Sequence, residues 1–536
     1  MLVPSRRRFL AGLSSGALAA ILPAAPASAL ALATGFQQGV AEAAARDEVL
    51  AAFYRARGLD GIWTGSDGRD VARRNALLAA MAEAPVHGLG VRRHDPEALV
   101  RTLRAAATPR EQGHAEVEMS RAFLRLAGDL NAGMLVPSKV EDHIKREVLA
   151  ADPLAVITVF PEEEPVAFLR GLAPTTAEYA RLLREKAALE ERIAAGGWGP
   201  EVPIGKLEPG ASGAAVRTLR DRLIDMGRLR PTAGARYDAG LTAAVRQFQA
   251  DHGLAPDGVA GEGTLREVNA SPTDRLRSVL VALERERWNA APRGSRHVWV
   301  NLTDFTAAIM DDDVPTFRTR AVIGATADDR QTPEFSDLMQ FMVVNPSWFV
   351  PRSIIVNEYL PQLRGNPNAA GHLRITDSSG RVIDRGSVDF SAYSASSFPY
   401  AMSQPPGPSN ALGVVKFMFP NPWNIYLHDT PAKDLFGRET RAFSHGCIRL
   451  ADPRGFARHL LARQVRDPEA LFDEKLRSGA ETRVNLDQPV PVHLEYRTAF
   501  TNVRGGLQFR RDVYGRDGRI WAALEVEGVE AAPLRG

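Results

Sequence analysis

The spacing of apolar residues predicts different structures in the two halves of the chain. Between residues 41 and 189, apolar side chains recur at helical intervals; Met119, Phe123 and Leu126, for example, fall on one face of a helix. After residue 290 the pattern changes to alternation, as in 297–302, which is typical of a half-buried strand. We therefore expect an α+β protein built from several domains.

A small helical unit is predicted between these halves. Residues 194–203 (AAGGWGPEVP) are rich in Gly and Pro and indicate a linker. After it, Val216, Leu219 and Leu223 recur at helical spacing, and two shorter periodic runs follow. The spacing predicts three short helices around one small core over residues 204–270.

The β-rich half contains one long interruption, at about 335–410. It includes NPSWFVPRSIIVNEYLP and SQPPGPSNALG and shows no simple strand rhythm. A stretch of this length is expected to be a functional insertion such as a lid, a packed structural subdomain, or both. Around it, Asp452-Pro453 marks the start of a helix. Strands are predicted at 305–310, 317–323, 341–344, 414–419, 425–428 and 492–496.

The N-terminus has the pattern of an export signal. Residues 6–8 are three arginines, an Ala- and Leu-rich apolar run follows to about residue 25, and 27–29 are Ala-Ser-Ala. This order predicts a signal peptide over 1–29, and its SRRRFL resembles a twin-arginine signal. An uncleaved membrane anchor is the alternative, although the run is shorter than the ~20 residues that span a bilayer.

Composition narrows the candidate chemistry. The chain is 45% hydrophobic and 24% charged, as in ordinary globular proteins, and its formal net charge of +2 does not favour a nucleic-acid partner. Cys447 is the single cysteine among 536 residues. One cysteine cannot form an internal disulfide, so in an exported chain Cys447 is either a buried small hydrophobe or a reactive thiol.

The neighbours of Cys447 favour a reactive thiol. His428-Asp429 ends a predicted strand, and His445-Gly446 directly precedes the cysteine. A thiol nucleophile needs a base, here His428 or His445, so we expect Cys447 to be ionised beside an imidazole. Gly446 allows backbone N–H groups to approach a developing oxyanion. Zinc held by the two histidines and Cys447 is an alternative for which only Asp429 offers a fourth ligand; we expect no metal and no cofactor.

These residues also carry a family resemblance. Sixteen residues separate His428 from His445, and SHGCIR, from Ser444 to Arg449, resembles the signature of L,D-transpeptidases with a YkuD catalytic domain. Residues 204–270, with YDAGLTAAVRQFQADHGLAPDGVAG, resemble a peptidoglycan-binding domain. The strings NPSWFVPRSI, PPGPSNALGVVKFMFPN and IYLHDTP are similar to the long YcbB-type members. Those members combine a helical scaffold, a peptidoglycan-binding domain and a catalytic domain with a capping insertion.

Together, the patterns and the resemblance divide the chain into five parts. These are a twin-arginine-type signal peptide at 1–29, a mostly helical scaffold domain at 40–195, a three-helix peptidoglycan-binding domain at 204–270, a β-rich catalytic domain at 274–470 with the capping insertion at about 335–410, and a C-terminal extension at 471–536 that packs on the scaffold or catalytic domain.

The resemblance implies a role for each site residue. Cys447 attacks the carbonyl that precedes the terminal D-Ala of a tetrapeptide stem and forms a thioester, and His428 is its base. The backbone carbonyl of Asp429 would orient His428, while His445 and Gly446 would shape the oxyanion pocket together with the Cys447 N–H. Ser444 would support the turn, and Arg449 would position the substrate. Tyr426 and Trp348 would line the cleft, although either is alternatively a core residue.

The expected function is therefore a periplasmic L,D-transpeptidase that forms 3–3 crosslinks. Its partners would be peptidoglycan stem peptides and glycan strands, and carbapenem-type inhibitors would bind it covalently. The same residues serve an L,D-carboxypeptidase, or a transferase that joins the stem to a D-amino acid or an outer-membrane protein. The alternative of another class is a non-catalytic peptidoglycan-binding protein. The oligomeric state stays open.

Overall fold

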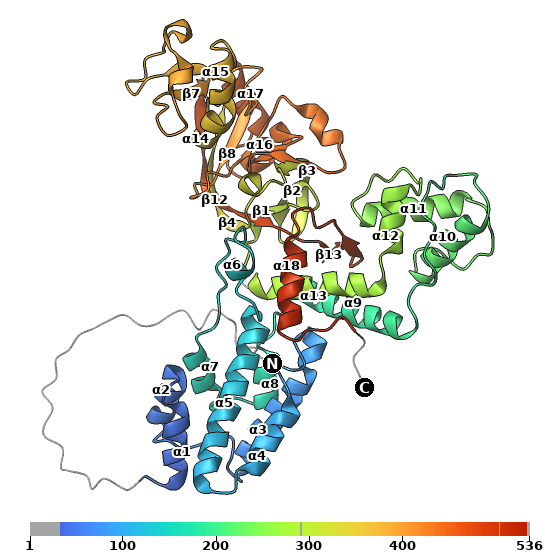
Figure 1. Ribbon diagram of the computed structural model, residues 1–536, viewed down its shortest axis with the longest axis vertical. Coiled ribbons are helices and arrows are strands. Elements are labelled where there is room, and N and C mark those ends of the chain that lie inside the picture. Colours follow the sequence, from blue (N-terminus) through green and yellow to red (C-terminus); the bar gives the residue numbers. More distant parts are fainter. Residues whose placement is uncertain (1–32, 290–291, 503, 533–536) are drawn as a thin grey trace, which may run out of the picture.

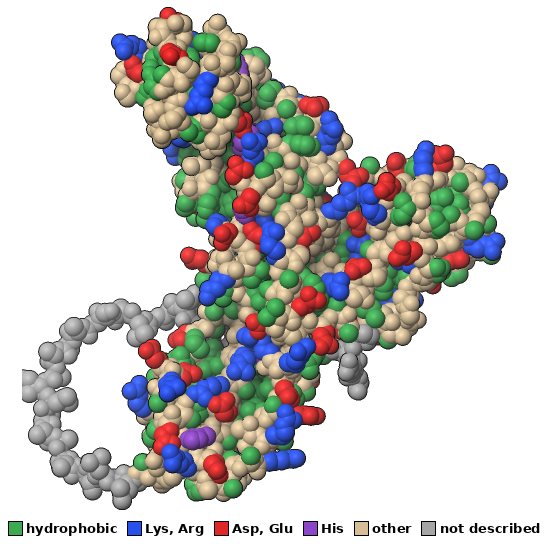
Figure 2. Space-filling model, viewed as in Figure 1, with side chains coloured by type: hydrophobic (Ala, Val, Ile, Leu, Met, Phe, Trp, Pro, Cys, Tyr) green, Lys and Arg blue, Asp and Glu red, His purple; other side chains and the backbone are tan. Residues whose placement is uncertain are grey.

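The computed structural model describes residues 33–289, 292–502 and 504–532, so the signal peptide predicted at 1–29 lies outside the described residues. Figure 1 shows a helical lobe at one end, a β-rich lobe at the other and a small helical lobe to the side. Acidic and basic side chains are interspersed over the face in Figure 2, in keeping with the small net charge. Within the described ranges, no helix is both long and apolar enough to cross a bilayer.

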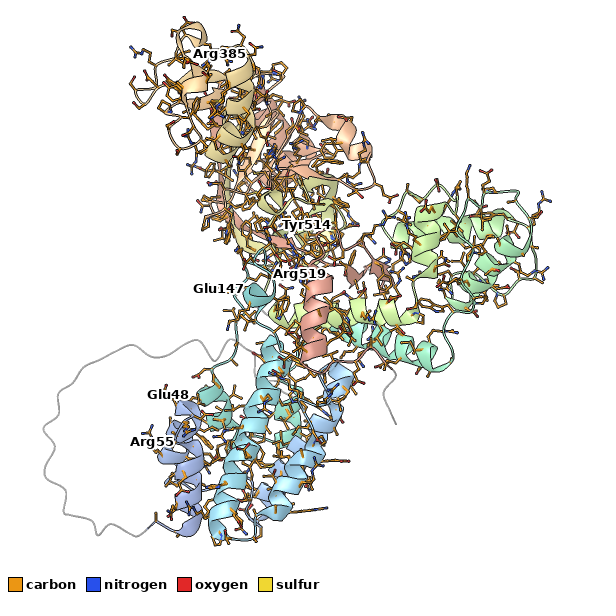
Figure 3. The ribbon with its side chains drawn as sticks, viewed as in Figure 1. Glu48, Arg55, Glu147, Arg385, Tyr514 and Arg519 are labelled. Carbon is orange, nitrogen blue, oxygen red and sulfur yellow. The ribbon has the colours of Figure 1, made fainter. Side chains whose placement is uncertain are left out.

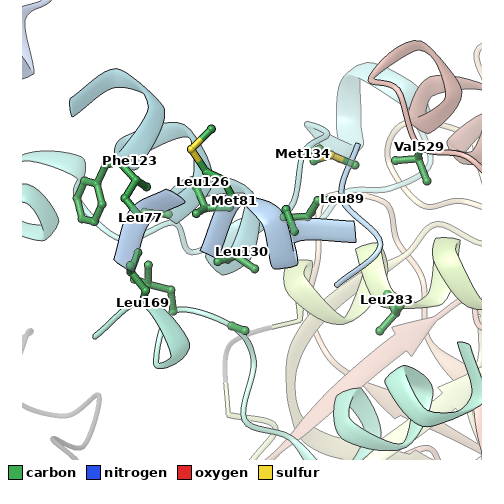
Figure 4. Packing of buried hydrophobic residues seen from close by; sticks show 14 of the residues in the cluster. Leu77, Met81, Leu89, Phe123, Leu126, Leu130, Met134, Leu169, Leu283 and Val529 are labelled. Atoms are coloured by element: carbon green, nitrogen blue, oxygen red, sulfur yellow. The ribbon is translucent and has the colours of Figure 1, made fainter. Parts of the chain in front are cut away.

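The helical lobe packs around α5 (Pro109–Ala132). A capping box between Thr108 and Glu111 starts this helix, and its periodic apolar face is buried as predicted. Figure 4 shows Phe123 and Leu126 of α5 close to Leu77 of α3. The other helices of the lobe are α1 (Gly35–Ala44), α2 (Glu48–Ala56), α3 (Gly68–Glu83), α4 (Pro96–Ala105), α6 (Pro137–Val140), α7 (Pro153–Val159), α8 (Pro165–Arg170) and α9 (Ala177–Ala194).

Helix α13 (Pro272–Trp288) belongs to the helical lobe, although the predicted catalytic domain begins at residue 274. Its residues Leu276, Val279 and Leu283 share one buried cluster with Phe123, and Figure 4 shows Leu283 at the edge of that core. The chain therefore returns from the small domain to complete the scaffold before it enters the sheet.

The small lobe has the three helices that the sequence predicts. Val216, Leu219, Leu223 and Phe248 lie in its own buried cluster, separate from the core of the helical lobe. Its helices are α10 (Ala214–Asp225), α11 (Ala239–Asp251) and α12 (Glu262–Asn269).

The β-rich lobe is built on one nine-stranded sheet of order β10-β3-β11-β9-β8-β4-β12-β1-β2. Strand β3 also pairs with β2, so the strands from β3 to β2 close into a ring and β10 is added at β3. Helices α16 (Pro453–Leu461) and α17 (Pro468–Arg477) add apolar side chains to the core of this sheet. The strands are β1 (Arg296–Asn301), β2 (Thr306–Asp311), β3 (Val314–Gly324), β4 (Phe335–Val344), β8 (Val415–Met418), β9 (Leu427–His428), β10 (Ala442–Ser444), β11 (Ile448–Leu450) and β12 (Thr482–Glu495).

Two predicted domain boundaries do not agree with the strands that form this sheet. Residues 482–495, placed in the C-terminal extension, form β12 between β4 and β1, because the alternating residues of its second half complete the core. Residues 335–344, placed in the insertion, form β4, which pairs along most of β12. The segment beyond β12 lies outside this sheet and contains β13 (Ala499–Thr501), β14 (Leu507–Phe509) and α18 (Arg516–Val526).

The insertion itself is a packed subdomain with its own core, which includes Ile355, Leu363 and Met402. It lies at the far end of the β-rich lobe in Figure 1. Arg385, labelled at its tip in Figure 3, holds its loops together by donating to the carbonyls of Ala369 and Ala370. Its elements are β5 (Trp348–Phe349), α14 (Arg352–Ile354), the π-helix η5 (Ile355–Tyr359), α15 (Leu360–Gly365), β6 (Arg374–Thr376) and β7 (Ala401–Gln404).

Buried ion pairs join the helical lobe to the sheet. Arg285 of α13 donates to Glu334, next to β4, at 2.7 Å and lies 2.7 Å from Asp517 of α18. Arg516 reaches the other oxygen of Glu334 at 3.1 Å. Removing one partner from such a buried group leaves an uncompensated charge, so this contact fixes the sheet on the scaffold.

Candidate active site

The pairing of β9 with β11 brings the predicted site residues to one face of the sheet. The two short strands are parallel, with Leu427 opposite Ile448 and His428 opposite Arg449. Leu427 and Ile448 are fully buried in the core. Because side chains alternate along a strand, His428 and Arg449 face the opposite side.

Tyr426 and Cys447 lie two residues before His428 and Arg449, and therefore share their face. The backbone of Ile448 donates to the Tyr426 carbonyl at 3.0 Å, which places Cys447 beside Tyr426. The Tyr426 ring meets the His428 ring edge-on, with centroids 5.6 Å apart. Thiol, imidazole, phenol and guanidinium thus form one cluster.

His428 is held as a neutral imidazole of defined tautomer. Its Nδ1 contacts the backbone carbonyl of Asp429, so Nδ1 carries the proton and Nε2 has the free lone pair. The pKa of His428 is lowered to about 3, first by burial and then by the charge of Arg449, while the Asp429 contact opposes both. The Asp429 carboxylate is bound elsewhere, by the Val414 N–H at 2.9 Å and by Lys433.

Cys447 is a half-buried thiol whose Sγ lies 3.5 Å from the Asn424 carbonyl. Its pKa is raised to about 11, because burial outweighs the hydrogen bonds with Tyr426 and the charge of Arg449, which act to lower it. Burial therefore acts against the thiolate that the sequence predicts for the resting site. Desolvation disfavours the charged form of both partners, so the resting pair is a neutral thiol and a neutral imidazole.

The turn before Cys447 requires glycine at its centre. Gly446 has φ +111°, and a Cβ there would meet Ile425 Cδ1 at 3.1 Å. Its N–H donates to Ser444 Oγ at 3.2 Å, and Ser444 Oγ in turn donates to the Cys447 carbonyl. The Gly446 N–H is thus occupied by Ser444, so the part predicted for Gly446 is the shape of the pocket and not a donor to it. In the part of the chain that the structure describes, the N–H groups of His445 and Cys447 have no protein acceptor.

Residues distant in sequence support this turn. Buried Thr332 donates from Oγ1 to the Gly446 carbonyl at 2.7 Å and accepts from the Gly324 N–H at 2.9 Å. Tyr514, labelled in Figure 3, donates to the Gly324 carbonyl at 2.6 Å. The C-terminal segment therefore braces the turn at 444–447, a role for which the sequence holds no local signal.

The capping insertion also reaches the turn at 444–447. His445 Nε2 lies 2.5 Å from Glu358 Oε1 in the π-helix η5, and Arg330 donates to the same oxygen at 2.7 Å. His445 is therefore bound to the insertion, whereas His428 is bound to its own strand. Trp348 lies in the sheet of the insertion and packs partly on its core.

Lys416 is a site residue that sequence reasoning missed. It lies on β8 directly opposite His428 on β9, so both side chains share a face. Its signal was the alternation in VKFM: Val415 and Phe417 are buried in the core, whereas Lys416 and Met418 are not.

Among the described residues, no three His, Cys, Asp or Glu side chains gather so that they could hold a metal ion.

Three parts of the chain match the models of known protein families. Residues 295–484 match the "L,D-transpeptidase catalytic domain" family (YkuD), 48–185 match a "Scaffold domain", and 212–267 match a "Putative peptidoglycan binding domain". A Haemophilus influenzae protein described as "Putative L,D-transpeptidase" is 31% identical over 242 residues, which cover 45% of this chain and 48% of that protein. The chain thus spans about half the length of this curated relative.

Two solved structures are also similar in part. An L,D-transpeptidase fragment from Xylanimonas cellulosilytica is 16% identical, with 55% of this chain and 98% of that chain covered and a TM-score of 0.17. A fused Zn-dependent amidase/peptidase/peptidoglycan-binding domain protein from Clostridium acetobutylicum is 14% identical, with 55% and 100% covered and a TM-score of 0.16.

Proposed function

We propose that the protein is a peptidoglycan L,D-transpeptidase that forms 3–3 crosslinks. Three parts of the chain support this, because they match models of an L,D-transpeptidase catalytic domain, a scaffold domain and a putative peptidoglycan binding domain. The observation that supports this most is the cluster on β9 and β11, where a thiol and an imidazole of fixed tautomer share one face. The substrates are the stem peptides of peptidoglycan.

In the first half-reaction Cys447 takes the acyl group of the stem. Sγ bonds to the carbonyl carbon of the diamino acid, which forms the peptide bond to D-Ala. The thiol proton moves to His428 Nε2 at the same time, so no free thiolate is needed beforehand. The N–H groups of Cys447 and His445 stabilise the oxyanion. The C–N bond to D-Ala then breaks, the proton passes from His428 to the leaving amine, and the stem remains as a thioester.

In the second half-reaction an amine of another stem attacks the thioester. Its proton moves to His428, the C–S bond breaks, and the proton returns to the sulfur, which restores the thiol. Water in place of the amine gives an L,D-carboxypeptidase, and a free D-amino acid or a protein amine gives another transferase. The insertion bound to His445 through Glu358 is suited to exclude water from this step.

We further propose that the protein works in the periplasm after export by the twin-arginine-type signal at 1–29. Crosslinks form outside the cytoplasm, where the three-domain organisation would hold the catalytic lobe on the wall.

Product analysis tests the proposed reaction. A defined disaccharide tetrapeptide incubated with residues 30–536 is expected to yield free D-Ala and a dimer joined between two diamino acids. Tripeptide without dimer would replace the transpeptidase by the carboxypeptidase. Absence of both products, with the peptide recovered intact, would favour the non-catalytic alternative.

The neutral thiol predicts a characteristic pH dependence. With the pKa of Cys447 raised to about 11, its alkylation by iodoacetamide is expected to rise about tenfold per pH unit from pH 6 to 9. The chain has one cysteine, so the reagent reports on this thiol alone. A rate that is already at a plateau between pH 5 and 8 would instead indicate a preformed thiolate–imidazolium pair.

The small lobe is predicted to serve wall association more than turnover. Deletion of 204–269 is expected to weaken co-sedimentation with insoluble peptidoglycan while turnover of a soluble tetrapeptide is largely retained. The lobe is docked through Asp251, which accepts from Gln508 at 2.9 Å and, at its carbonyl, from Arg510 at 2.9 Å. The variant Gln508→Ala, which keeps the lobe but loosens its docking, is the control. If soluble turnover collapses on deletion, the lobe is a structural part of the catalytic unit.

A further inference from the structure

A row of three basic side chains crosses the active face of the sheet. Lys416 on β8, His428 on β9 and Arg449 on β11 are successive register partners, Lys416 opposite His428 and His428 opposite Arg449. Their strand neighbours Phe417 and Leu427 are buried on the other side. The row therefore borders the space in front of Cys447.

The outer two members of this row are cations without protein partners. Within the described ranges, neither Lys416 nor Arg449 makes a side-chain hydrogen bond or ion pair, and Arg449 Nε is fully enclosed. Burial lowers the pKa of both side chains. The charge of Glu481 acts to raise the pKa of Lys416, but the Glu481 carboxylate accepts its hydrogen bond from the Ser347 N–H, at 3.0 Å, and not from Lys416. A half-buried cation without an anion is unfavourable, so such a pair indicates a site for an anionic ligand.

The order of the strands gives Lys416 a specific position in the proposed reaction. Cys447 lies on the β11 side, His428 is in the middle, and Lys416 is one strand further on, about 4.8 Å away, which its four-carbon chain spans. The amine that leaves at His428 belongs to D-Ala, whose carboxylate is one carbon from that nitrogen. A substrate laid from Cys447 across His428 therefore brings this carboxylate to Lys416.

We propose that Lys416 binds the terminal carboxylate of the leaving D-amino acid and so selects stems with a free C-terminus. This rests on the proposed transpeptidase function. By microscopic reversibility the attacking amine occupies the position of the leaving amine. Lys416 therefore also favours acceptors that have a carboxylate on the same carbon as the attacking amine, over plain primary amines. Lys416 is thus a specificity-determining residue that binds the carboxylate, whereas His428 remains the residue that accepts and returns the proton.

The test compares a tetrapeptide stem with the same peptide as its C-terminal amide. The wild-type protein is expected to release D-Ala from the acid about ten- to a hundredfold faster, in kcat/KM, than D-alaninamide from the amide, as for one charge-assisted hydrogen bond. Lys416→Met is expected to lower kcat/KM for the acid by this factor, to leave the amide unchanged and to bring their ratio near one. Lys416→Arg is expected to keep most of the preference.

The control is Lys433→Met. Lys433 also acts on the pKa of His428, but it pairs with the Asp429 carboxylate outside the row. This variant is expected to keep the acid-to-amide ratio, because it removes a charge near His428 without removing the carboxylate site. Iodoacetamide labelling of Cys447 and the melting temperature report on folding of each variant.

Each outcome supports or overturns the inference. An active wild-type protein with no preference for the acid overturns it even if Lys416→Met does not fold, and so does a Lys416→Met variant that keeps the preference. Wild-type protein that cleaves neither peptide refutes the proposed function instead. Labelled D-alanine compared with D-alaninamide as acceptor is expected to show the same dependence on Lys416.

Discussion

Replacing Cys447 by alanine is expected to abolish release of D-Ala from a tetrapeptide stem, with a loss of at least about 10⁴-fold. No other cysteine exists in the chain, so no second thiol can substitute. The hydrogen bond from Ser444 Oγ goes to the Cys447 carbonyl, which alanine retains, so the turn is expected to survive. D-Ala release followed by mass spectrometry, alongside the melting temperature, measures both effects.

Cys447→Ser is the matched variant, because it keeps a hydroxyl nucleophile at the same place. It is expected to fold and to be nearly as inactive, since the alcohol is a far weaker nucleophile toward this amide without a stronger base. A Cys447→Ala protein that still turns over would remove the thioester from the account.

Replacing His428 by alanine is expected to cost about 10²- to 10⁴-fold in kcat, the usual contribution of a positioned general base. Burial favours the protonated thiol, so each attack has to pass its proton to an acceptor, and Nε2 of His428 is free for it. His428→Gln, which fills more of the buried space, separates loss of the base from loss of packing.

Alkylation of Cys447 at pH 9 is the internal control for His428→Ala. A small reagent needs only thiolate, which is governed by the pKa of the thiol, so labelling is expected to persist while turnover is lost. A loss of turnover below about tenfold would give the base role to His445, whose Nε2 would then have to leave Glu358.

Local patterns were sufficient to predict several helices and most strands of the large sheet. Periodicity identified α5 and the three helices of the small lobe, and alternation identified β1, β8 and β9, because each buries one face on a single core. The boundary at 470 was wrong because β12 enters the sheet by pairing with β1, nearly two hundred residues earlier, which no local signal reveals.

Chemistry was predicted less completely than fold. The spacing of His428 and Cys447 identified both residues, but their charge states depend on how far the folded chain excludes water, and spacing does not report burial. Glu358 reaches His445 from 87 positions away through a separate subdomain. Lys416 could have been recognised, since a lone cation in a strand between inward-facing Val415 and Phe417 must lie on the other face.

The measurement that tests the account most directly is the intact mass of the protein after brief mixing with a tetrapeptide stem and an acid quench. The account predicts an adduct equal to the stem without its terminal D-Ala, located on Cys447 by peptide mapping and absent from Cys447→Ala. Release of D-Ala from a chain whose mass never changes, or an adduct on any other residue, would contradict it.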